Sequence, residues 1–411
     1  MVSMRLVGRG IVALALVMAV VLGFVLLNQA APVPNPASPS PAGSTVATAT
    51  ARATGPAGTP TAPAPTDESV PSDSPTPTDG GSGPSIAQLI GQKLVIRMDG
   101  TTPSADLLGR IGRGEIGGVI LFGANITTEA ALIALIGELQ TAAVDGGQPP
   151  LLIAVDQEGG PIKRIPWAPP TLSVPEMGAD GTTTVAEDQG ASTGTALQEL
   201  GINLDLAPVA DVPGSTGSFM YKAKRTFSFD AVRTAELADA FASGLQSAGV
   251  LPSMKHFPGL GLAAKDTDSS VVTITASRDA LDAGLDPYRT AIASGIPMIM
   301  LSNATYSAFD PDNAAGWSAA ICDTLLRGDL GFTGVTITDS LTGTAKARSL
   351  SPGALAIRAA RAGTDMILVT GSEPATRSVY AALLRSATAG SIPVATLQAS
   401  YDRILALKAG L

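Results

Sequence analysis

Short apolar runs alternate with longer amphipathic stretches through the second, larger part of the chain. The runs have the length and the β-branched composition of strands, and the stretches between them have the apolar spacing of helices. Strands that are apolar throughout indicate a parallel sheet that is buried on both faces. The expected strands span 93–98, 117–122, 151–156, 203–209, 251–257, 297–304, 334–339 and 365–370.

Helical periodicity fills most of the segments between these strands. The expected helices span 129–143, 184–199, 231–248, 279–294, 317–328, 353–363, 376–389 and 395–409. Strand–helix units repeated in this way predict the α/β fold class, as a (β/α)8 barrel of the TIM type; an open doubly wound sheet is the alternative. No G-x-G-x-x-G turn follows any of the strands, so the sequence gives no support for dinucleotide binding.

The first part of the chain differs in composition from the rest. Residues 11–27 are apolar without interruption and follow two arginines, which indicates a signal peptide or a membrane anchor within residues 1–30. The cleavage signal after this run is poor, which favours an uncleaved anchor that attaches the protein to a membrane. Residues 31–84 consist almost wholly of Pro, Ala, Ser, Thr and Gly and are predicted to form a disordered linker. The barrel domain is expected at 85–411, outside the cytoplasm.

Charge and composition narrow the possible functions. The chain of 411 residues has a formal net charge of −9 and no basic stripe, which argues against a nucleic-acid partner. A single cysteine, Cys322, excludes an intramolecular disulfide framework. Because His256 is the only histidine, the sequence has no Cys/His cluster for a structural zinc site.

Polar side chains stand at the ends of several expected strands. They are Asp156, Asp211, Lys255, His256, Asn303 and Asp339. In a (β/α)8 barrel the C-terminal ends of the strands carry the active site. A single aspartate in such a place is as often the N-cap of the next helix, but several polar groups at one rim favour a site. Dense charged hydrogen-bonding groups suit a carbohydrate partner, whose hydroxyls they bind.

Six segments, in this order along the chain, resemble a known family. They are VDQEGGPIKR (155–164), INLDLAPVADV (202–212), KRTFSFD (224–230), KHFPG (255–259), GFTGVTITDSL (331–341) and ALAIRAARAGTDMILV (354–369). Together they resemble glycoside hydrolase family 3, in its single-domain β-N-acetylglucosaminidase branch, over nearly all of residues 87–410. The resemblance implies hydrolysis of terminal β-linked N-acetylglucosamine with retention of configuration and without a cofactor.

The resemblance also implies roles for individual residues. Asp339 matches the nucleophile that forms a covalent glycosyl intermediate, and capping of the next helix is the alternative. The residues that match the family's sugar contacts are Asp156, Arg164, Arg225, Lys255 and His256. A buried structural role is the alternative for the histidine. The family usually has an arginine where this chain has Pro161, so one local contact differs.

The loop after KHFPG departs from the family pattern. In the family an aspartate and a histidine of this loop form the general acid/base dyad. Here Asp266 takes the place of the dyad aspartate, Asp268 that of the dyad histidine, and Leu260 that of an earlier loop histidine. Asn303 likewise stands where relatives often have a histidine.

Four interpretations of this loop remain open. Asp268 is the acid/base, with Asp266 raising its pKa by like-charge repulsion, in a hydrolase of cell-wall or related glycans. Alternatively, the protein binds sugar with little turnover, or it acts on a different β-glycoside. A purely structural alternative is a solvated loop whose aspartates form turns.

Overall fold

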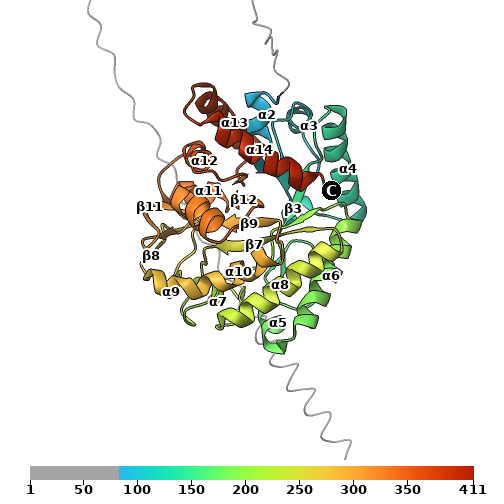
Figure 1. Cartoon of the computed structure of the whole chain (residues 1–411). Helices are drawn as coiled ribbons and strands as arrows, with labels where there is room; N and C mark the ends of the chain where they lie inside the picture. The colour runs from blue at the N-terminus through green and yellow to red at the C-terminus, as the bar shows by residue number, and fades with distance from the viewer. Residues whose placement is uncertain (1–82) are drawn as a thin grey trace, which may run out of the picture. The chain divides into compact units, whose positions relative to one another are not determined.

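The computed structural model describes residues 83–411 (Figure 1). The expected signal peptide or anchor in 1–30, with its apolar run at 11–27, lies outside the described residues. The same holds for the 31–84 linker except its last two residues. Among the helices that are described, none is long and apolar enough to cross a membrane.

A barrel of eight parallel strands forms the centre of the molecule, and every strand lies within a range expected from the sequence. The strands are β1 (Leu94–Arg97), β2 (Gly118–Ile120), β3 (Leu152–Val155), β6 (Leu204–Asp205), β7 (Leu251–Phe257), β9 (Met298–Leu301), β12 (Val335–Thr338) and β13 (Ile367–Val369). They pair in the order β12-β9-β7-β6-β3-β2-β1-β13. A parallel bridge between Ile337 and Met366 joins the first strand of this order to the last. The barrel prediction is confirmed, and the open doubly wound sheet is wrong.

Helices surround the barrel (Figure 1). The longer ones agree with the sequence predictions except over 279–294, where a 3-10 turn at Ala283–Leu285 separates two helices. Pro287, which has no N–H to donate, lies in the first turn of the second helix, where proline is tolerated. The helices are α2 (Ile86–Gly91), α3 (Ala105–Gly112), α4 (Glu129–Asp145), α5 (Val174–Asp180), α6 (Thr183–Glu199), α7 (Phe219–Lys222), α8 (Ala231–Ser247), α9 (Arg278–Asp282), α10 (Asp286–Ala293), the π-helix η4 (Ala320–Asp329), α11 (Leu341–Ala347), α12 (Pro352–Arg361), α13 (Glu373–Thr388) and α14 (Val394–Lys408).

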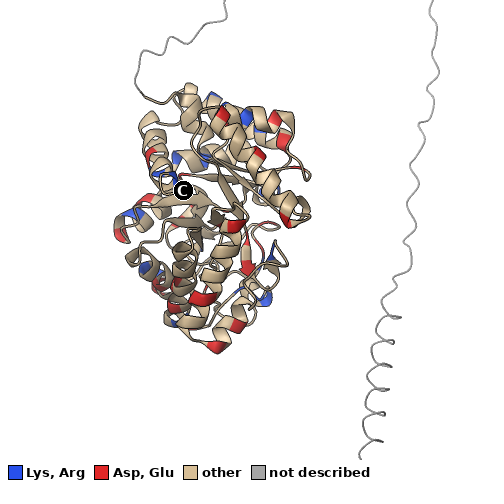
Figure 2. Ribbon diagram, turned by 90° about the vertical axis from the view of Figure 1, so that its right-hand side faces the viewer, with Lys and Arg blue, Asp and Glu red and all other residues tan. Residues whose placement is uncertain are grey.

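The apolar strands separate two layers of core. In β1, Val95 points into the barrel, whereas Leu94 and Ile96 pack outward beneath the helices. Both layers are buried, which explains why the strands are apolar without alternation. Charged residues of both signs are distributed over the outer helices and loops (Figure 2).

The C-terminal helix α14 closes the N-terminal end of the barrel. Arg403 donates to the buried carboxylate of Asp365 at 2.7 Å, just before β13. Lys408 donates to the Gln92 side chain and to the carbonyl of Gly117, both at 2.7 Å, just before β1 and β2. The opposite end, where the strands finish, is left for the site.

Loops at that opposite end carry two small sheets. A hairpin, β4 (Gln157–Gly159) with β5 (Ile162–Lys163), follows β3 directly. The second sheet combines β8 (Thr273–Ile274), β10 (Thr305–Tyr306) and β11 (Asp310–Ala314). These sheets give the rim of the barrel fixed backbone positions from which side chains can be held.

Candidate active site

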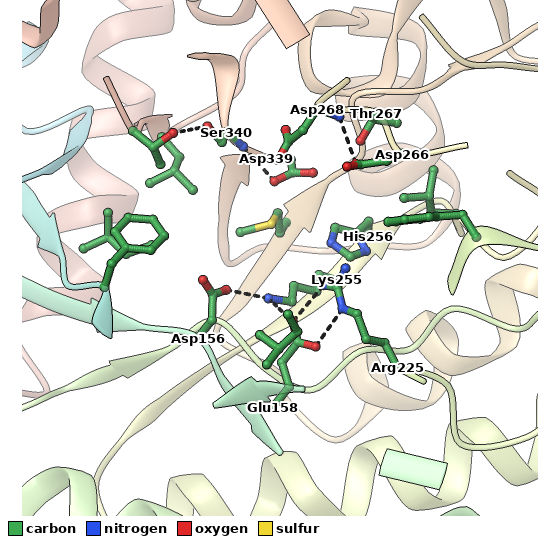
Figure 3. A pocket seen from close by; sticks show the side chains of 18 of the residues that line it. Asp156, Glu158, Arg225, Lys255, His256, Asp266, Thr267, Asp268, Asp339 and Ser340 are labelled. Atoms are coloured by element: carbon green, nitrogen blue, oxygen red, sulfur yellow. Dashed lines mark hydrogen bonds and ion pairs between the residues drawn. The ribbon is translucent and has the colours of Figure 1, made fainter. Parts of the chain in front are cut away.

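A pocket of about 300 Å³ opens at the C-terminal ends of the barrel strands (Figure 3). All eight residues to which the sequence analysis gave a role line it, although they come from distant segments of the chain. They are Asp156, Arg164, Arg225, Lys255, His256, Asp266, Asp268 and Asp339. Ile120, Met300 and Leu368, which belong to the core inside the barrel, also line it. The pocket therefore has an apolar floor and charged walls.

A buried lysine joins two carboxylates on one wall of the pocket (Figure 3). The Lys255 ammonium lies 2.8 Å from Asp156 and 2.7 Å from Glu158, and its side chain is 2% exposed. Arg225 donates to both oxygens of Glu158, at 2.8 and 2.7 Å. Arg164 reaches the other oxygen of Asp156 at 3.2 Å. These five residues form what we call the ion network.

Electrostatics keep the ion network charged. Burial would raise the pKa of Asp156, but Lys255 and Arg164 outweigh it and lower that pKa to about 2. For Glu158, burial is likewise outweighed by Arg225 and Lys255, so its pKa is lowered. Burial disfavours the charged ammonium of Lys255, yet the two carboxylates raise its pKa. The network thus presents fixed donors and acceptors at neutral pH, which suits several adjacent sugar hydroxyls.

Glu158 is a site residue that the sequence analysis missed. It lies in the VDQEGG segment, two residues after Asp156, and its side chain is fully buried in the ion network. In an extended segment, residues two apart point to the same face. This spacing is the signal that could have identified Glu158.

His256 is held by a carboxylate behind the pocket. Its Nδ1 lies 2.7 Å from Oδ2 of Asp211, which is 0% exposed. His256 is itself buried, but its ring lines the pocket, so a structural role and a site position coexist. Asp211 and Asn303, two of the polar strand-end residues, do not line the pocket. The Asn303 amide instead donates to the carbonyl of Ser340 at 2.8 Å.

Asp339 follows β12 and directs its carboxylate into the pocket (Figure 3). The backbone N–H of Ser340 donates to its Oδ1 at 2.7 Å. The N-cap of α11 is Ser340, whose hydroxyl accepts a hydrogen bond from the N–H of Thr342. Asp339 therefore does not cap the helix, and its carboxylate remains available to the pocket.

The loop that carries Asp266 and Asp268 is anchored against the neighbouring α11. Thr267, between the two aspartates, is 2% exposed, and its carbonyl accepts a hydrogen bond from Thr344 at 2.8 Å. The N–H of Asp268 donates to Asp266 at 3.0 Å. Both carboxylates lie on the same side of the pocket as Asp339 (Figure 3). A freely solvated turn does not describe this loop.

Asp268 has the properties of a group that can hold a proton near neutral pH. Partial desolvation, then the charges of Asp339 and Asp266, raise the pKa of Asp268 to about 7. The residue remains exposed at the mouth of the pocket, so water partly screens these charges. Within residues 83–411, no three His, Cys, Asp or Glu side chains are arranged to hold a metal ion.

Known proteins with similar sequences define the class of this barrel. An uncharacterized secreted glycosyl hydrolase of Arthroderma benhamiae is 32% identical over 341 residues, covering 79% of this chain and 94% of the relative. A beta-hexosaminidase of Nitrosomonas eutropha is 34% identical over 286 residues, covering 67% and 80%. With its carboxylate-lined pocket, the protein is a glycosidase, an enzyme that hydrolyses O-glycosyl compounds.

The particular family follows from the sequence and the fold together. The family model described as the glycosyl hydrolase family 3 N terminal domain matches residues 85–407, so the chain belongs to this family. A solved family 3 beta-N-acetylglucosaminidase from Paenibacillus sp. str. FPU-7 has a TM-score of 0.77 and 32% identity. The match covers 80% of this chain and 63% of that one. The family resemblance noted in the sequence is confirmed.

Proposed function

We propose that the protein is a β-N-acetylhexosaminidase that releases terminal β-linked N-acetylglucosamine from cell-wall or related glycans with retention of configuration. The observation that carries this proposal is that the Asp339 carboxylate shares one small pocket with the ion network. The network offers charged partners to the hydroxyls of a single sugar, and the pocket volume suits one terminal sugar. The N-acetyl sugar is proposed from the names of the relatives and of the solved structure.

The pocket supports a two-step mechanism. In the first step a carboxylate oxygen of Asp339 attacks the anomeric carbon, the bond to the leaving oxygen breaks, and Asp268 gives its proton to that oxygen. In the second step Asp268 takes a proton from water, the water oxygen attacks the anomeric carbon, and Asp339 is released. Asp266 assists by raising the pKa of Asp268.

Substrate binding in this proposal is the work of the ion network and of the neighbouring histidine. The sugar hydroxyls would contact Asp156, Arg164, Arg225, Lys255 and His256, all of which line the pocket. Glu158 holds Lys255 and Arg225 in place from beneath.

We also propose that the enzyme acts outside the cytoplasm. The apolar run at 11–27 supports an export signal or an anchor, and the linker at 31–84 would separate a membrane from the catalytic barrel at 85–411. A relative described as secreted supports the same placement.

Hydrolysis of a chromogenic aryl β-N-acetylglucosaminide tests the proposed function. We expect turnover by the full chain and a loss of about 10⁴-fold in Asp339→Asn, because the nucleophile is removed without a change of shape. The matched control is Asp310→Asn, which alters a partly buried carboxylate that does not line the pocket.

The same assay separates the alternatives. Undetectable turnover of every aryl glycoside, with retained sugar binding, would favour a glycan-binding protein and contradict the proposal. A clear preference for the β-glucoside over the N-acetyl sugar would instead overturn the substrate while leaving the mechanism in place.

A further inference from the structure

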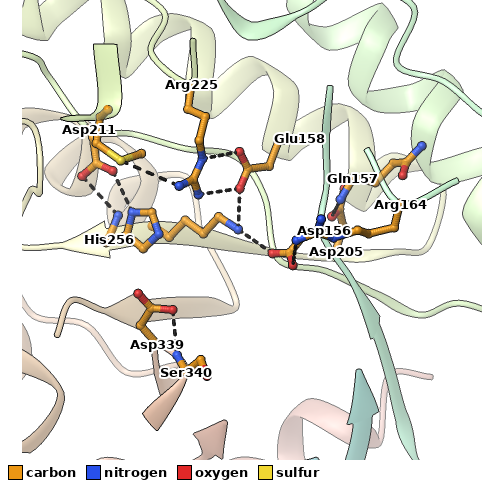
Figure 4. Close-up of polar contacts among 12 residues, drawn as sticks. Asp156, Gln157, Glu158, Arg164, Asp205, Asp211, Arg225, His256, Asp339 and Ser340 are labelled. Atoms are coloured by element: carbon orange, nitrogen blue, oxygen red, sulfur yellow. Dashed lines mark hydrogen bonds and ion pairs between the residues drawn. The ribbon is translucent and has the colours of Figure 1, made fainter. Parts of the chain in front are cut away.

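The only histidine of the chain has one ring nitrogen committed to a buried acceptor. His256 Nδ1 lies 2.7 Å from Asp211 Oδ2. A carboxylate accepts hydrogen bonds, so this contact requires a proton on Nδ1. Because Nδ1 is turned towards Asp211, the opposite edge of the ring, with Nε2, is the edge left to face the pocket that His256 lines (Figure 4).

Asp211 is itself fixed in one orientation. Its Oδ1 accepts the backbone N–H groups of His256 at 3.3 Å and of Leu260 at 2.6 Å. Only Oδ2 is then directed at the imidazole, and the fully buried carboxylate cannot turn without leaving two backbone donors unpaired. The backbone therefore determines which oxygen meets the ring.

We propose that Asp211 is a positioning residue that holds His256 in the neutral Nδ1–H tautomer, so that Nε2 accepts a hydrogen bond from a sugar hydroxyl. The inference rests on the proposed sugar-binding function and deepens it. The lysine and arginines of the ion network can only donate hydrogen bonds, and its carboxylates are charged acceptors. His256 adds an uncharged acceptor. The site thereby selects a sugar with a hydroxyl that can donate at this point.

Asp211→Asn should reverse the tautomer. The two backbone N–H groups keep the amide oxygen in the place of Oδ1, which puts the amide nitrogen where Oδ2 was. This nitrogen donates, so Nδ1 must become an acceptor and the proton moves to Nε2. The ring then presents a donor to the pocket in place of an acceptor.

Nitrogen-15 NMR of the imidazole reads the tautomer directly. Because His256 is the only histidine, the full chain gives one set of ring signals without assignment. At pH 8 we expect the Nδ1–H form in the wild type, the Nε2–H form in Asp211→Asn, and the wild-type form in the control Asp310→Asn. An Nε2–H or doubly protonated ring in the wild type would overturn the inference, and this measurement does not depend on the variant folding.

Binding of N-acetylglucosamine provides the second readout. We expect Asp211→Asn to weaken its affinity about tenfold, the scale of one hydrogen bond, at an unchanged melting temperature. Among analogues in which one hydroxyl is replaced by fluorine, which cannot donate, one should lose more affinity for the wild type than for Asp211→Asn. Equal affinity of wild type and variant for every analogue would contradict the positioning role. If the wild type binds no N-acetylglucosamine at all, the proposed function fails, and the tautomer alone decides the role of Asp211.

Discussion

The raised pKa of Asp268, on the loop after β7, leads to a specific prediction about the pH dependence of catalysis. With a pKa raised to about 7, Asp268 holds its proton in about nine tenths of molecules at pH 6 and in about one tenth at pH 8. If the protonated form is the general acid, kcat/KM should fall about tenfold over this interval. The assay is a pH profile with an aryl β-N-acetylglucosaminide whose phenol is a poor leaving group.

Two substitutions in the loop test which group causes the fall of kcat/KM between pH 6 and 8, the alkaline limb of the profile. Asp268→Asn should lower the rate by about 10²–10⁴-fold with the poor leaving group. The loss should be much smaller with a dinitrophenyl glycoside, whose leaving oxygen needs no proton. Asp266→Asn removes a like charge that raises the pKa of Asp268, so the limb should move to lower pH. Ser269→Ala, in the same loop, is the control and should leave the profile unchanged.

The outcome that refutes this reasoning is specific. An alkaline limb that persists at the same pH in Asp268→Asn would assign the titration to another group. Equal losses for the poor and the good leaving group would show that Asp268 shapes the pocket and does not transfer a proton. Either result would favour the interpretation of the loop as a degenerate form of the family's dyad.

Two further predictions concern the buried carboxylates. Glu158→Gln leaves Lys255 and Arg225 buried with too little negative charge, so the free energy of unfolding measured in urea should fall by about 3 kcal/mol or more. The exposed control Glu236→Gln should lose less than about 1 kcal/mol, and an equally small loss in Glu158→Gln would contradict the prediction. Burial raises the pKa of Asp205 to about 8, so the native state retains a proton that the unfolded chain releases near pH 4, and stability falls as pH rises between these values. Asp205→Asn should gain stability relative to the wild type across this window, and a difference that stays constant from pH 5 to 8 would count against it.

The barrel could be predicted because both faces of its strands are buried, which leaves an uninterrupted apolar signal. The short helices gave a weaker signal. Helix α3 has a cap at Ser104 and buried side chains at Leu107 and Ile111, but it is only 8 residues long. The break at Ala283–Leu285 was missed because the apolar spacing continues through it.

The sequence indicated which polar residues stand at strand ends, but not which of their side chains reach the pocket. Asp211 and Asn303 follow strands as Asp339 does, yet one binds His256 from behind and the other binds a backbone carbonyl. The sequence shows where a strand finishes, whereas the twist of the barrel decides which side chains reach the pocket. Glu158 was missed although its spacing from Asp156 places both on one face of an extended segment; the hairpin after β3 then brings its carboxylate to Lys255.

One side of the pocket, formed by the ion network and His256, is held by more buried contacts than the other side, which the loop with Asp268 forms. This difference affects which residues of the site can be replaced at low cost. The ion network and the Asp211–His256 pair are buried. In the ion network each carboxylate has two cationic partners, so one substitution there leaves a buried charge without its full complement. Asp268 is exposed on a loop, and its backbone N–H donates a hydrogen bond to the Asp266 carboxylate. The side that we propose binds the sugar is therefore costly to alter, whereas an exposed residue of the loop that would supply the proton can be replaced at less cost. An aspartate where the family pattern has the dyad histidine is the kind of change that this asymmetry permits, because it leaves the buried partners within the ion network and around His256 unchanged.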